Sequence, residues 1–213
     1  MILILILTLT IPSILASNIV VTSSVPPIDY PVRFGYINIL NDWSSPQGIA
    51  KSLGVPGYAA PHKYNYICLT FWTINQGPVD AAYVWNNSKT YLSPLFGNTD
   101  TAIKANLKKI YNDNGIRLMV SAFGSTETPT TSGYDPTFYA QRLADFVASN
   151  NLDGVDIDWE DTTAFQSGVG EQWLITFTTV LRNILPSAII THAPQAPYFG
   201  GTAHYPKNAY LAI

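Results

Sequence analysis

Short apolar runs alternate with amphipathic segments along most of this chain of 213 residues, from about residue 32 onward. The apolar runs predict five strands, at residues 32–39, 64–72, 117–123, 153–160 and 187–193. Between the later runs, apolar positions recur every three or four residues, which is the spacing of a helix that buries one face. Strands and helices that alternate in this way form right-handed βα units around a parallel sheet, so we predict an α/β fold.

Three helices are predicted between these strands, and each has a recognisable end. Asp100 caps the first helix, and the pair Asn114-Gly115 ends it. Asp135-Pro136 opens the second as N-cap and first helical residue, and Pro186 stops the third. The apolar stripes comprise Ile103, Leu107, Ile110 and Tyr111 in the first helix, Tyr139, Leu143, Phe146 and Val147 in the second, and Trp173, Phe177, Val180, Leu181 and Ile184 in the third.

The fourth predicted strand is acidic. It reads Asp153-Gly154-Val155-Asp156-Ile157-Asp158-Trp159-Glu160, in a chain of which only 12% is charged. Because side chains alternate between the two faces of a strand, Asp156, Asp158 and Glu160 share one face and the three apolar residues between them share the other. Such a strand is typical of an α/β barrel that packs its apolar side on helices and carries chemistry where its strands end.

Three carboxylates on one face repel one another and lose hydration, so we expect at least one to keep its proton near neutral pH. Glu160, nearest the loop, is the candidate for donating a proton to a leaving oxygen. Asp158 and Asp156 lie deeper, where a charge could stabilise a positive intermediate. A cation site is the alternative, because Ca²⁺ and Mg²⁺ also bind clustered carboxylates. A buried extended strand differs from the bent loops that bind calcium, so the pattern favours catalysis.

The acidic segment resembles the D-G-x-D-x-D-x-E signature of the family 18 glycoside hydrolases, the chitinases and related endo-β-N-acetylglucosaminidases, at every defined position. Residues 34–36, 67–74 and 118–124 are similar to the first three barrel strands of that family, and the likeness runs from residue 32 to about 200. In the third strand, Phe123 stands where the family has a glycine. The resemblance implies a (β/α)₈ TIM barrel, of which this chain holds only about the first five βα units.

The resemblance also implies hydrolysis by substrate-assisted retention, an exception to the scheme that uses two enzyme carboxylates. Glu160 would protonate the bridging oxygen while the 2-acetamido carbonyl of the substrate attacks the anomeric carbon and forms an oxazolinium ion. Asp158 would hold the acetamido N–H, and Asp156 would exchange a proton with Asp158. Ser121 would hydrogen-bond Asp156, and Asp153 would be structural. No cofactor and no metal are expected.

Aromatic residues are the expected sugar platforms, because flat rings stack on the apolar faces of pyranoses. Tyr36 and Phe71 match family positions that line the central subsite. Four further aromatic residues could extend the cleft or equally be ordinary packing: Trp43, Trp72, Trp85 and Tyr198. The spacing of His62, His192 and His204 forms no metal motif, and we expect His192 to be packed.

The net charge of −3, without a basic cluster, argues against nucleic acid or an anionic membrane surface as a partner. It fits a neutral substrate such as chitin or N-acetylglucosamine oligosaccharides. The triplet Asn86-Asn87-Ser88 is an acceptor for an N-glycan at Asn86. The single cysteine, Cys68, lies in an apolar run and is expected to be a buried, inert thiol.

The domain organisation begins with a predicted secretory signal peptide at residues 1–17. A membrane anchor and a buried strand are the alternatives, but the apolar run is shorter than the roughly 20 residues of a bilayer span. Residues 18–31 form a proline-rich lead-in. The mature protein is therefore expected to be secreted and extracellular, with no membrane contact after signal removal.

We predict that residues 32–213 form an incomplete family 18 catalytic barrel. A complete barrel takes about 250 residues, and the sequence shows no strands six to eight. We expect a fragment or short form with weak stability and activity. The favoured function is a glycosidase that degrades chitin. A non-catalytic carbohydrate-binding protein, such as a chitinase-like lectin, is the alternative, although the intact Glu160 favours an enzyme. Within the enzymes, chitin and N-glycan substrates are not distinguished.

Overall fold

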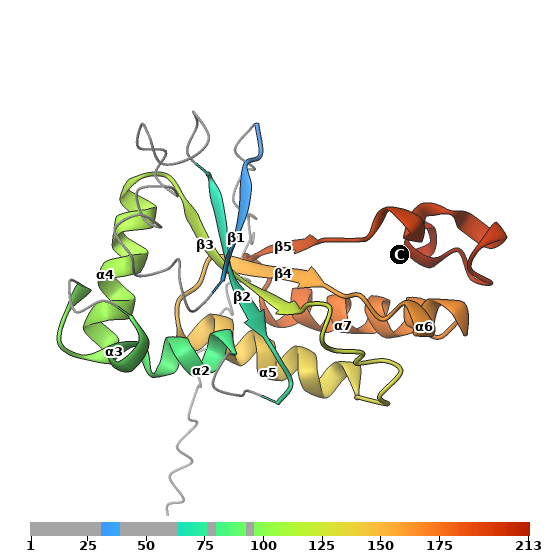
Figure 1. The fold of residues 1–213 in the computed structure, drawn as a ribbon, viewed down its shortest axis with the longest axis horizontal. Coiled ribbons are helices and arrows are strands. Elements are labelled where there is room, and N and C mark those ends of the chain that lie inside the picture. The colour runs from blue at the N-terminus through green and yellow to red at the C-terminus, as the bar shows by residue number, and fades with distance from the viewer. Residues whose placement is uncertain (1–30, 39–63, 76–79, 93–95) are drawn as a thin grey trace, which may run out of the picture.

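A computed structural model describes residues 31–38, 64–75, 80–92 and 96–213. Five strands form one parallel sheet in which each strand lies beside its neighbour in sequence (Figure 1). The strands are β1 (Phe34–Asn38), β2 (Tyr66–Trp72), β3 (Arg117–Phe123), β4 (Gly154–Asp158) and β5 (Ile189–His192). The predicted α/β architecture of about five βα units is confirmed.

The sheet keeps the predicted strands but trims several ends. β1 and β2 each begin two residues later than predicted. At this end, the side chain of Asn65 takes the place of backbone hydrogen bonds between the two strands. Its Oδ1 accepts the Arg33 N–H at 2.6 Å, and its Nδ2 donates to the Pro31 carbonyl at 3.0 Å. β5 is shorter at both ends, and the guanidinium of Arg182 binds the Ala188 carbonyl at 2.7 Å just before it begins.

Helices connect the strands, and their predicted ends are confirmed except for one N-cap. The three predicted helices are α4, α5 and α7, and the shorter ones were not predicted. Thr99, rather than Asp100, is the N-cap of α4, whereas Asp135 caps α5 as predicted and accepts the Phe138 N–H at 2.7 Å. The helices are α2 (Ala81–Asn86), α3 (Ser88–Tyr91), α4 (Asp100–Asp113), α5 (Pro136–Ser149), α6 (Thr162–Gln166) and α7 (Gly170–Ile184), followed by the 3₁₀ turns η2 (Ala196–Phe199), η3 (Gly201–Ala203) and η4 (Ala209–Ala212).

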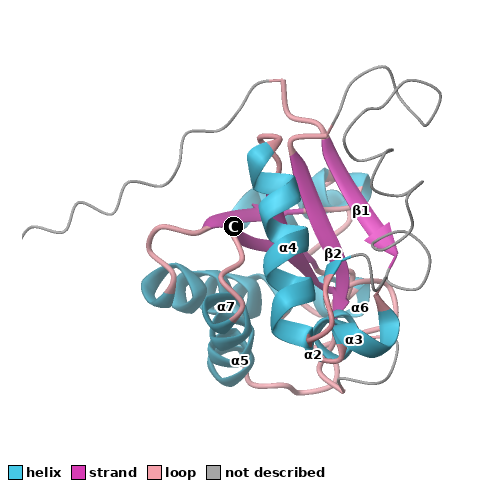
Figure 2. Ribbon diagram, turned by 90° about the vertical axis from the view of Figure 1, so that its left-hand side faces the viewer, coloured by secondary structure: helices cyan, strands magenta, loops and turns pink. Residues whose placement is uncertain are grey.

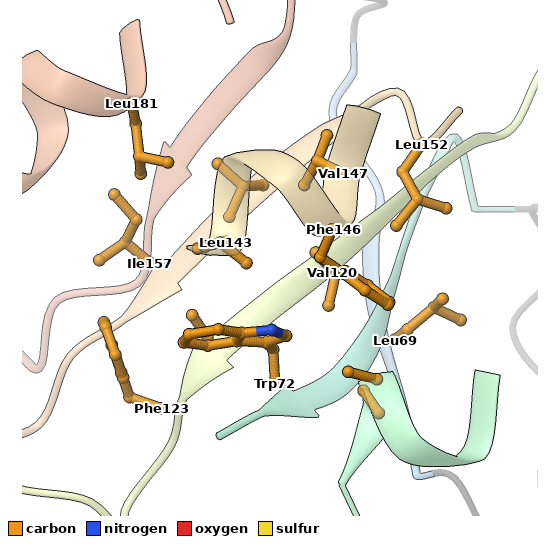
Figure 3. Close-up of a cluster of buried hydrophobic side chains, with 14 of the residues drawn as sticks. Leu69, Trp72, Val120, Phe123, Leu143, Phe146, Val147, Leu152, Ile157 and Leu181 are labelled. Atoms are coloured by element: carbon orange, nitrogen blue, oxygen red, sulfur yellow. The ribbon is translucent and has the colours of Figure 1, made fainter. Parts of the chain in front are cut away.

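One face of the sheet and the helices share the main apolar core. Figure 2 shows α5 and α7 lying next to each other, and Figure 3 shows where side chains from both helices meet the strands. The side chains labelled there are Leu69, Trp72, Val120, Phe123 and Ile157 from the strands, Leu143, Phe146 and Val147 from α5, Leu152 from the loop before β4, and Leu181 from α7. The strand alternation therefore directs every second residue to the helices.

The other face of the sheet holds a second, smaller cluster. It comprises Tyr66, Cys68, Met119 and Ile189, with Phe34 packed against it. Cys68 is fully buried, and this burial raises the pKa of its thiol, so the expectation of a buried thiol is confirmed. The cluster fills this face toward the amino ends of the strands and leaves the region near their carboxyl ends to polar side chains.

Several sequence predictions fall outside the described residues. These are the signal peptide at 1–17, the lead-in except for residue 31, Trp43 and His62. Among the described helices, none has both the length and the apolar character required to cross a bilayer.

Candidate active site

β4 brings the acidic segment to the carboxyl end of the sheet. Val155 and Ile157 are fully buried against the helices, whereas Asp156 lies on the opposite face. The strand ends at Asp158, two residues before Glu160, so the prediction that the strand includes Glu160 is wrong. Trp159 is fully buried, with its ring 4.5 Å from that of Phe165. The segment therefore keeps its apolar side in the core beyond the end of the strand.

The residues around Asp153 and Gly154 set the start of this strand. Asp153 accepts the Leu118 N–H at 2.8 Å and pairs with Lys108 at 2.9 Å, so its structural role is supported by its contacts. Gly154 faces Ile189 in β5, and a Cβ at Gly154 would lie 2.1 Å from the Ile189 carbonyl oxygen. Only glycine fits this close approach of β4 and β5.

Asp156 accepts hydrogen bonds from three hydroxyl groups. Ser121 donates at 2.8 Å and Tyr36 at 3.0 Å to one carboxylate oxygen, and Thr191 donates at 2.5 Å to the other. Strand register explains two of these contacts, because Ser121 in β3 and Thr191 in β5 lie directly opposite Asp156. Together the three donors compensate for the burial of the charge, since Asp156 is only 1% exposed.

Asp158 has the perturbed titration that the cluster predicts. Burial, followed by the charges of Glu160 and Asp156, raises the pKa of Asp158 from 3.8 to about 7. The expectation that one of the three acids keeps its proton near neutral pH is thus met by the middle residue. A carboxyl that changes its charge near neutral pH is suited to a reaction in which charge appears and disappears nearby.

Glu160 lies just beyond β4 and is half-buried. Its carboxylate accepts a hydrogen bond from the side-chain amide of Gln195 at 2.5 Å. Its backbone carbonyl accepts the Thr162 N–H at 2.9 Å, at the entry to α6. Glu160 is therefore more accessible than Asp156, which is buried.

Two aromatic residues flank the acids. Tyr36 is 46% exposed, and its ring lies 6.5 Å from that of the half-buried Phe71. The Phe71 ring covers Gly124, where an added Cβ would come within 3.0 Å of it. The two partly exposed rings thus offer apolar surface to a ligand, and their role as sugar platforms stays a prediction.

Three of the four further aromatic candidates do not line this site, and the fourth, Trp43, lies outside the described residues. Trp72, Trp85 and Tyr198 are each fully buried and belong to the main core, so the suggestion that they extend the cleft is wrong. Packing dominates because these large rings fill space between the sheet and the helices or in the carboxyl-terminal segment. His192 is packed as predicted. Its two ring nitrogens lie 3.2 Å from the Thr178 hydroxyl and 3.0 Å from the Tyr210 hydroxyl.

Comparisons with known proteins place this geometry among solved structures. The chain is similar to a GH18 chitinase from Pseudoalteromonas aurantia, with a TM-score of 0.52 and 30% sequence identity; the match covers 78% of this chain and 56% of that one. The chain has a family 18 chitinase-like fold. A provisionally named Chitinase A from Streptomyces coelicolor shares this fold, with a TM-score of 0.50 and 21% identity, over 84% of this chain and 55% of that one. The chain thus spans about half the length of each. Neither protein-family models nor curated proteins gave a match.

Phe123 is a departure from the family 18 motif with a clear structural consequence. It keeps the backbone conformation that favours glycine, with φ at 82°, although it carries a large side chain. The ring is fully buried and lies 5.4 Å from Phe177, 5.8 Å from Trp173 and 6.3 Å from Trp72. The next residue, Gly124, donates its N–H to the Asp158 carbonyl at 3.0 Å. Packing of the aromatic ring therefore holds Phe123 in a backbone conformation that favours glycine.

Thr191 and Gln195 contact the candidate acids Asp156 and Glu160, and the sequence prediction did not include them among the site residues. Counting the inward positions of β5 from Ile189 would have indicated Thr191, because it falls opposite Asp156. Gln195 lies beyond the end of β5, where strand alternation gives no signal.

The cation alternative finds no support in the described part of the chain. There, no group of three or more His, Cys, Asp or Glu side chains is arranged to hold a metal ion. Both carboxylate oxygens of Asp156 already accept hydrogen bonds from hydroxyl groups. They therefore serve as hydrogen-bond acceptors rather than as metal ligands.

Proposed function

We propose that this chain is the catalytic part of a secreted glycosidase that cleaves β-1,4-linked N-acetylglucosamine by substrate-assisted retention. The observation that carries the proposal is the group of Asp156, Asp158 and Glu160 at the carboxyl end of β4, in which the pKa of the middle carboxyl is raised to about 7. The similarity to a GH18 chitinase supports glycoside hydrolysis.

In this reaction, Glu160 donates its proton to the bridging oxygen as the glycosidic bond breaks. The acetamido carbonyl of the substrate attacks the anomeric carbon, and the resulting oxazolinium ion carries the positive charge. Water then opens this ion and gives a proton to the Glu160 carboxylate, which restores the acid. An ionised Asp158 accepts the acetamido N–H, so it strengthens the carbonyl nucleophile and stabilises the positive charge.

Asp156 completes the cycle by sharing a proton with Asp158. Because the pKa of Asp158 is about 7, both of its forms are populated near neutral pH. Asp158 can ionise when the substrate is in place by giving its proton to Asp156. The hydroxyl groups of Ser121, Tyr36 and Thr191 suit both states of Asp156, because a hydroxyl can donate and accept.

Tyr36 and Phe71 bind the sugar ring at the point of cleavage in this proposal. Their partly exposed rings lie beside the carboxylates, and the substrate is uncharged, so apolar stacking supplies most of the contact.

The proposal includes secretion and an N-glycan at Asn86. Asn86 is exposed at the end of α2, which leaves room for a glycan. Ser88 of the acceptor triplet is buried, and its hydroxyl donates to the Asp100 carbonyl at 3.1 Å. A transferase that reads Ser88 would therefore act before this segment folds.

The test compares wild type with Glu160→Gln on a chitin oligomer and on a high-mannose glycopeptide. We expect wild type to cleave one of them and the variant to lose at least about 100-fold of that activity. Asp145→Asn, the same chemical change at an exposed position of α5, is the control and is expected to retain activity. Unchanged cleavage by Glu160→Gln would show that Glu160 is not the acid. Oligomer binding by wild type without any cleavage would support the lectin alternative.

A further inference from the structure

The backbone and the side chain of Glu160 belong to one closed ring of hydrogen bonds. Thr162 donates its N–H to the Glu160 carbonyl at 2.9 Å, and the Thr162 hydroxyl lies 2.8 Å from the Tyr198 hydroxyl. Tyr198 donates its N–H to the Gln195 carbonyl at 3.0 Å. The side-chain amide of Gln195 donates to the Glu160 carboxylate at 2.5 Å, which closes the ring.

Tyr198 anchors the ring of hydrogen bonds in the apolar core. It is fully buried, and its ring lies 4.9 Å from that of Phe165 and 6.2 Å from that of Trp159. Gln195 is itself exposed, yet its carbonyl is tied to this buried tyrosine. An isolated contact between two surface side chains contributes little, because water competes for both groups. Here the core fixes the backbone of both partners, so less conformational freedom is lost when they meet.

An amide is also chemically suited to a group that alternates between acid and base. Its N–H groups donate to a carboxylate, and after rotation its carbonyl oxygen accepts the O–H of a carboxylic acid. Glu160 passes through both states in every turnover of the proposed reaction. A lysine would favour the ionised state alone, and an aspartate would favour the protonated one.

We propose that Gln195 is the positioning residue of Glu160: it holds the carboxyl group in one orientation in both protonation states. This inference rests on the proposed function for its catalytic meaning, but the contact itself can be tested without catalysis. Tyr198 and Thr162 act through Gln195 and the Glu160 backbone.

The kinetic test uses Gln195→Met and Gln195→Glu. Methionine keeps the length of the side chain without its polar atoms, and we expect kcat to fall about ten-fold with KM changed less than about two-fold. Glutamate places a second carboxylate beside Glu160, so the alkaline limb of the pH profile of kcat moves to higher pH. Gln172→Met is the matched control, because Gln172 is exposed on α7 and contacts Thr176 instead; it is expected to behave as wild type.

The activity-independent test follows carboxyl ¹³C signals of glutamate by NMR as pH is varied. The sequence holds three glutamates, Glu127, Glu160 and Glu171, so Glu160→Gln assigns the signal directly. A hydrogen bond from the amide to the charged carboxylate is stronger than one between the amide and the neutral acid, so loss of the amide favours the acid. We therefore expect the Glu160 signal to titrate at higher pH in Gln195→Met, and at higher pH still in Gln195→Glu. Tyr198→Phe keeps the buried ring but breaks the contact with Thr162, and it should give a smaller shift in the same direction.

An unchanged Glu160 titration in both Gln195 variants would overturn the proposal, whatever the activity. If wild type cleaves neither substrate while the Glu160 signal responds to Gln195, the proposed function fails and the positioning contact stands. Equal losses of kcat in Gln195→Met and Gln172→Met would also contradict a specific role for Gln195.

Discussion

The phenol of Tyr36 donates a hydrogen bond to the carboxylate of Asp156 at 3.0 Å, although β2 and β3 lie between their two strands. A flat sheet could not bring β1 and β4 together in this way, because neighbouring strands are about 4.8 Å apart. The five strands therefore curl as part of a barrel. The curl brings side chains of β1, β3 and β5 to Asp156 in β4. The curvature that starts the barrel therefore also assembles the site.

Thr191→Val should weaken the support of Asp156 without changing the volume of the side chain. The buried charge loses the donor at 2.5 Å, so we expect the free energy of unfolding to fall by about 1–2 kcal/mol and kcat to fall about ten-fold. Denaturant titration and oligomer hydrolysis measure the two effects. Thr179→Val, at an exposed position of α7, is the control. Wild-type values in Thr191→Val would show that this hydroxyl does not support Asp156.

Asp158→Asn should change how stability depends on pH. The pKa of Asp158 is raised from 3.8 to about 7, so between these values the folded protein holds a proton that the unfolded chain has released. Stability from this group is therefore complete below about pH 4 and is lost as the pH rises through about 7. Asparagine removes this loss, and we expect Asp158→Asn to be more stable than wild type at pH 8 by about 1–2 kcal/mol, after allowance for solvent screening. Thermal unfolding at pH 5 and pH 8 measures the difference; a parallel pH dependence in both proteins would contradict the shift.

Phe123 offers a comparison in which glycine should be better tolerated than alanine. Both substitutions remove a ring that packs on Trp72, Trp173 and Phe177, at a cost of about 3–5 kcal/mol. Only glycine relieves the positive φ of 82°, which is worth about 1 kcal/mol. Denaturant midpoints should therefore rank wild type first, Phe123→Gly second and Phe123→Ala last. The reverse order of the two variants would show that the backbone at this position is not strained.

Gly154→Ala should be strongly destabilising. A methyl group there meets the Ile189 carbonyl oxygen at 2.1 Å, and neither strand can move without breaking the ladder between β4 and β5, so we expect a loss of about 3 kcal/mol or more. Gly133→Ala is the comparison, because its φ is also positive, at 74°, but no atom lies within 4 Å of the added methyl. It should cost about 1 kcal/mol. Equal losses in the two variants would remove the steric account of Gly154.

The apolar periodicity predicted the strands and long helices because their side chains follow the alternation of buried and exposed positions. β3 was predicted with correct bounds, since six of its seven residues are buried and both neighbours in the sheet are strands. Where a side chain takes over backbone hydrogen bonds, as Asn65 does, the pattern misplaced the ends. The short helices between β2 and α4 have too few turns to show a periodic stripe.

The site was predictable where it follows strand register and unpredictable where the chain has left the sheet. Ser121 hydrogen-bonds Asp156 as the resemblance implied, whereas the contact of Tyr36 with Asp156 was not predicted. Gln195 reaches Glu160 only because the segment after β5 folds back on Tyr198, a tertiary contact that no local pattern encodes. Trp72 and Trp85 look the same in sequence as sugar-binding tryptophans, and only the packing of α2, α5 and the sheet shows that they belong to the core.

The anomeric configuration of the first product tests the central claim most directly. Cleavage of a chitin oligomer by the wild-type chain is followed by ¹H NMR before the sugar anomers equilibrate. Attack by the substrate's own acetamido group predicts the β-anomer, together with no cleavage of the matching oligomer that lacks acetyl groups. Initial release of the α-anomer, or equal cleavage of the deacetylated oligomer, would contradict the account.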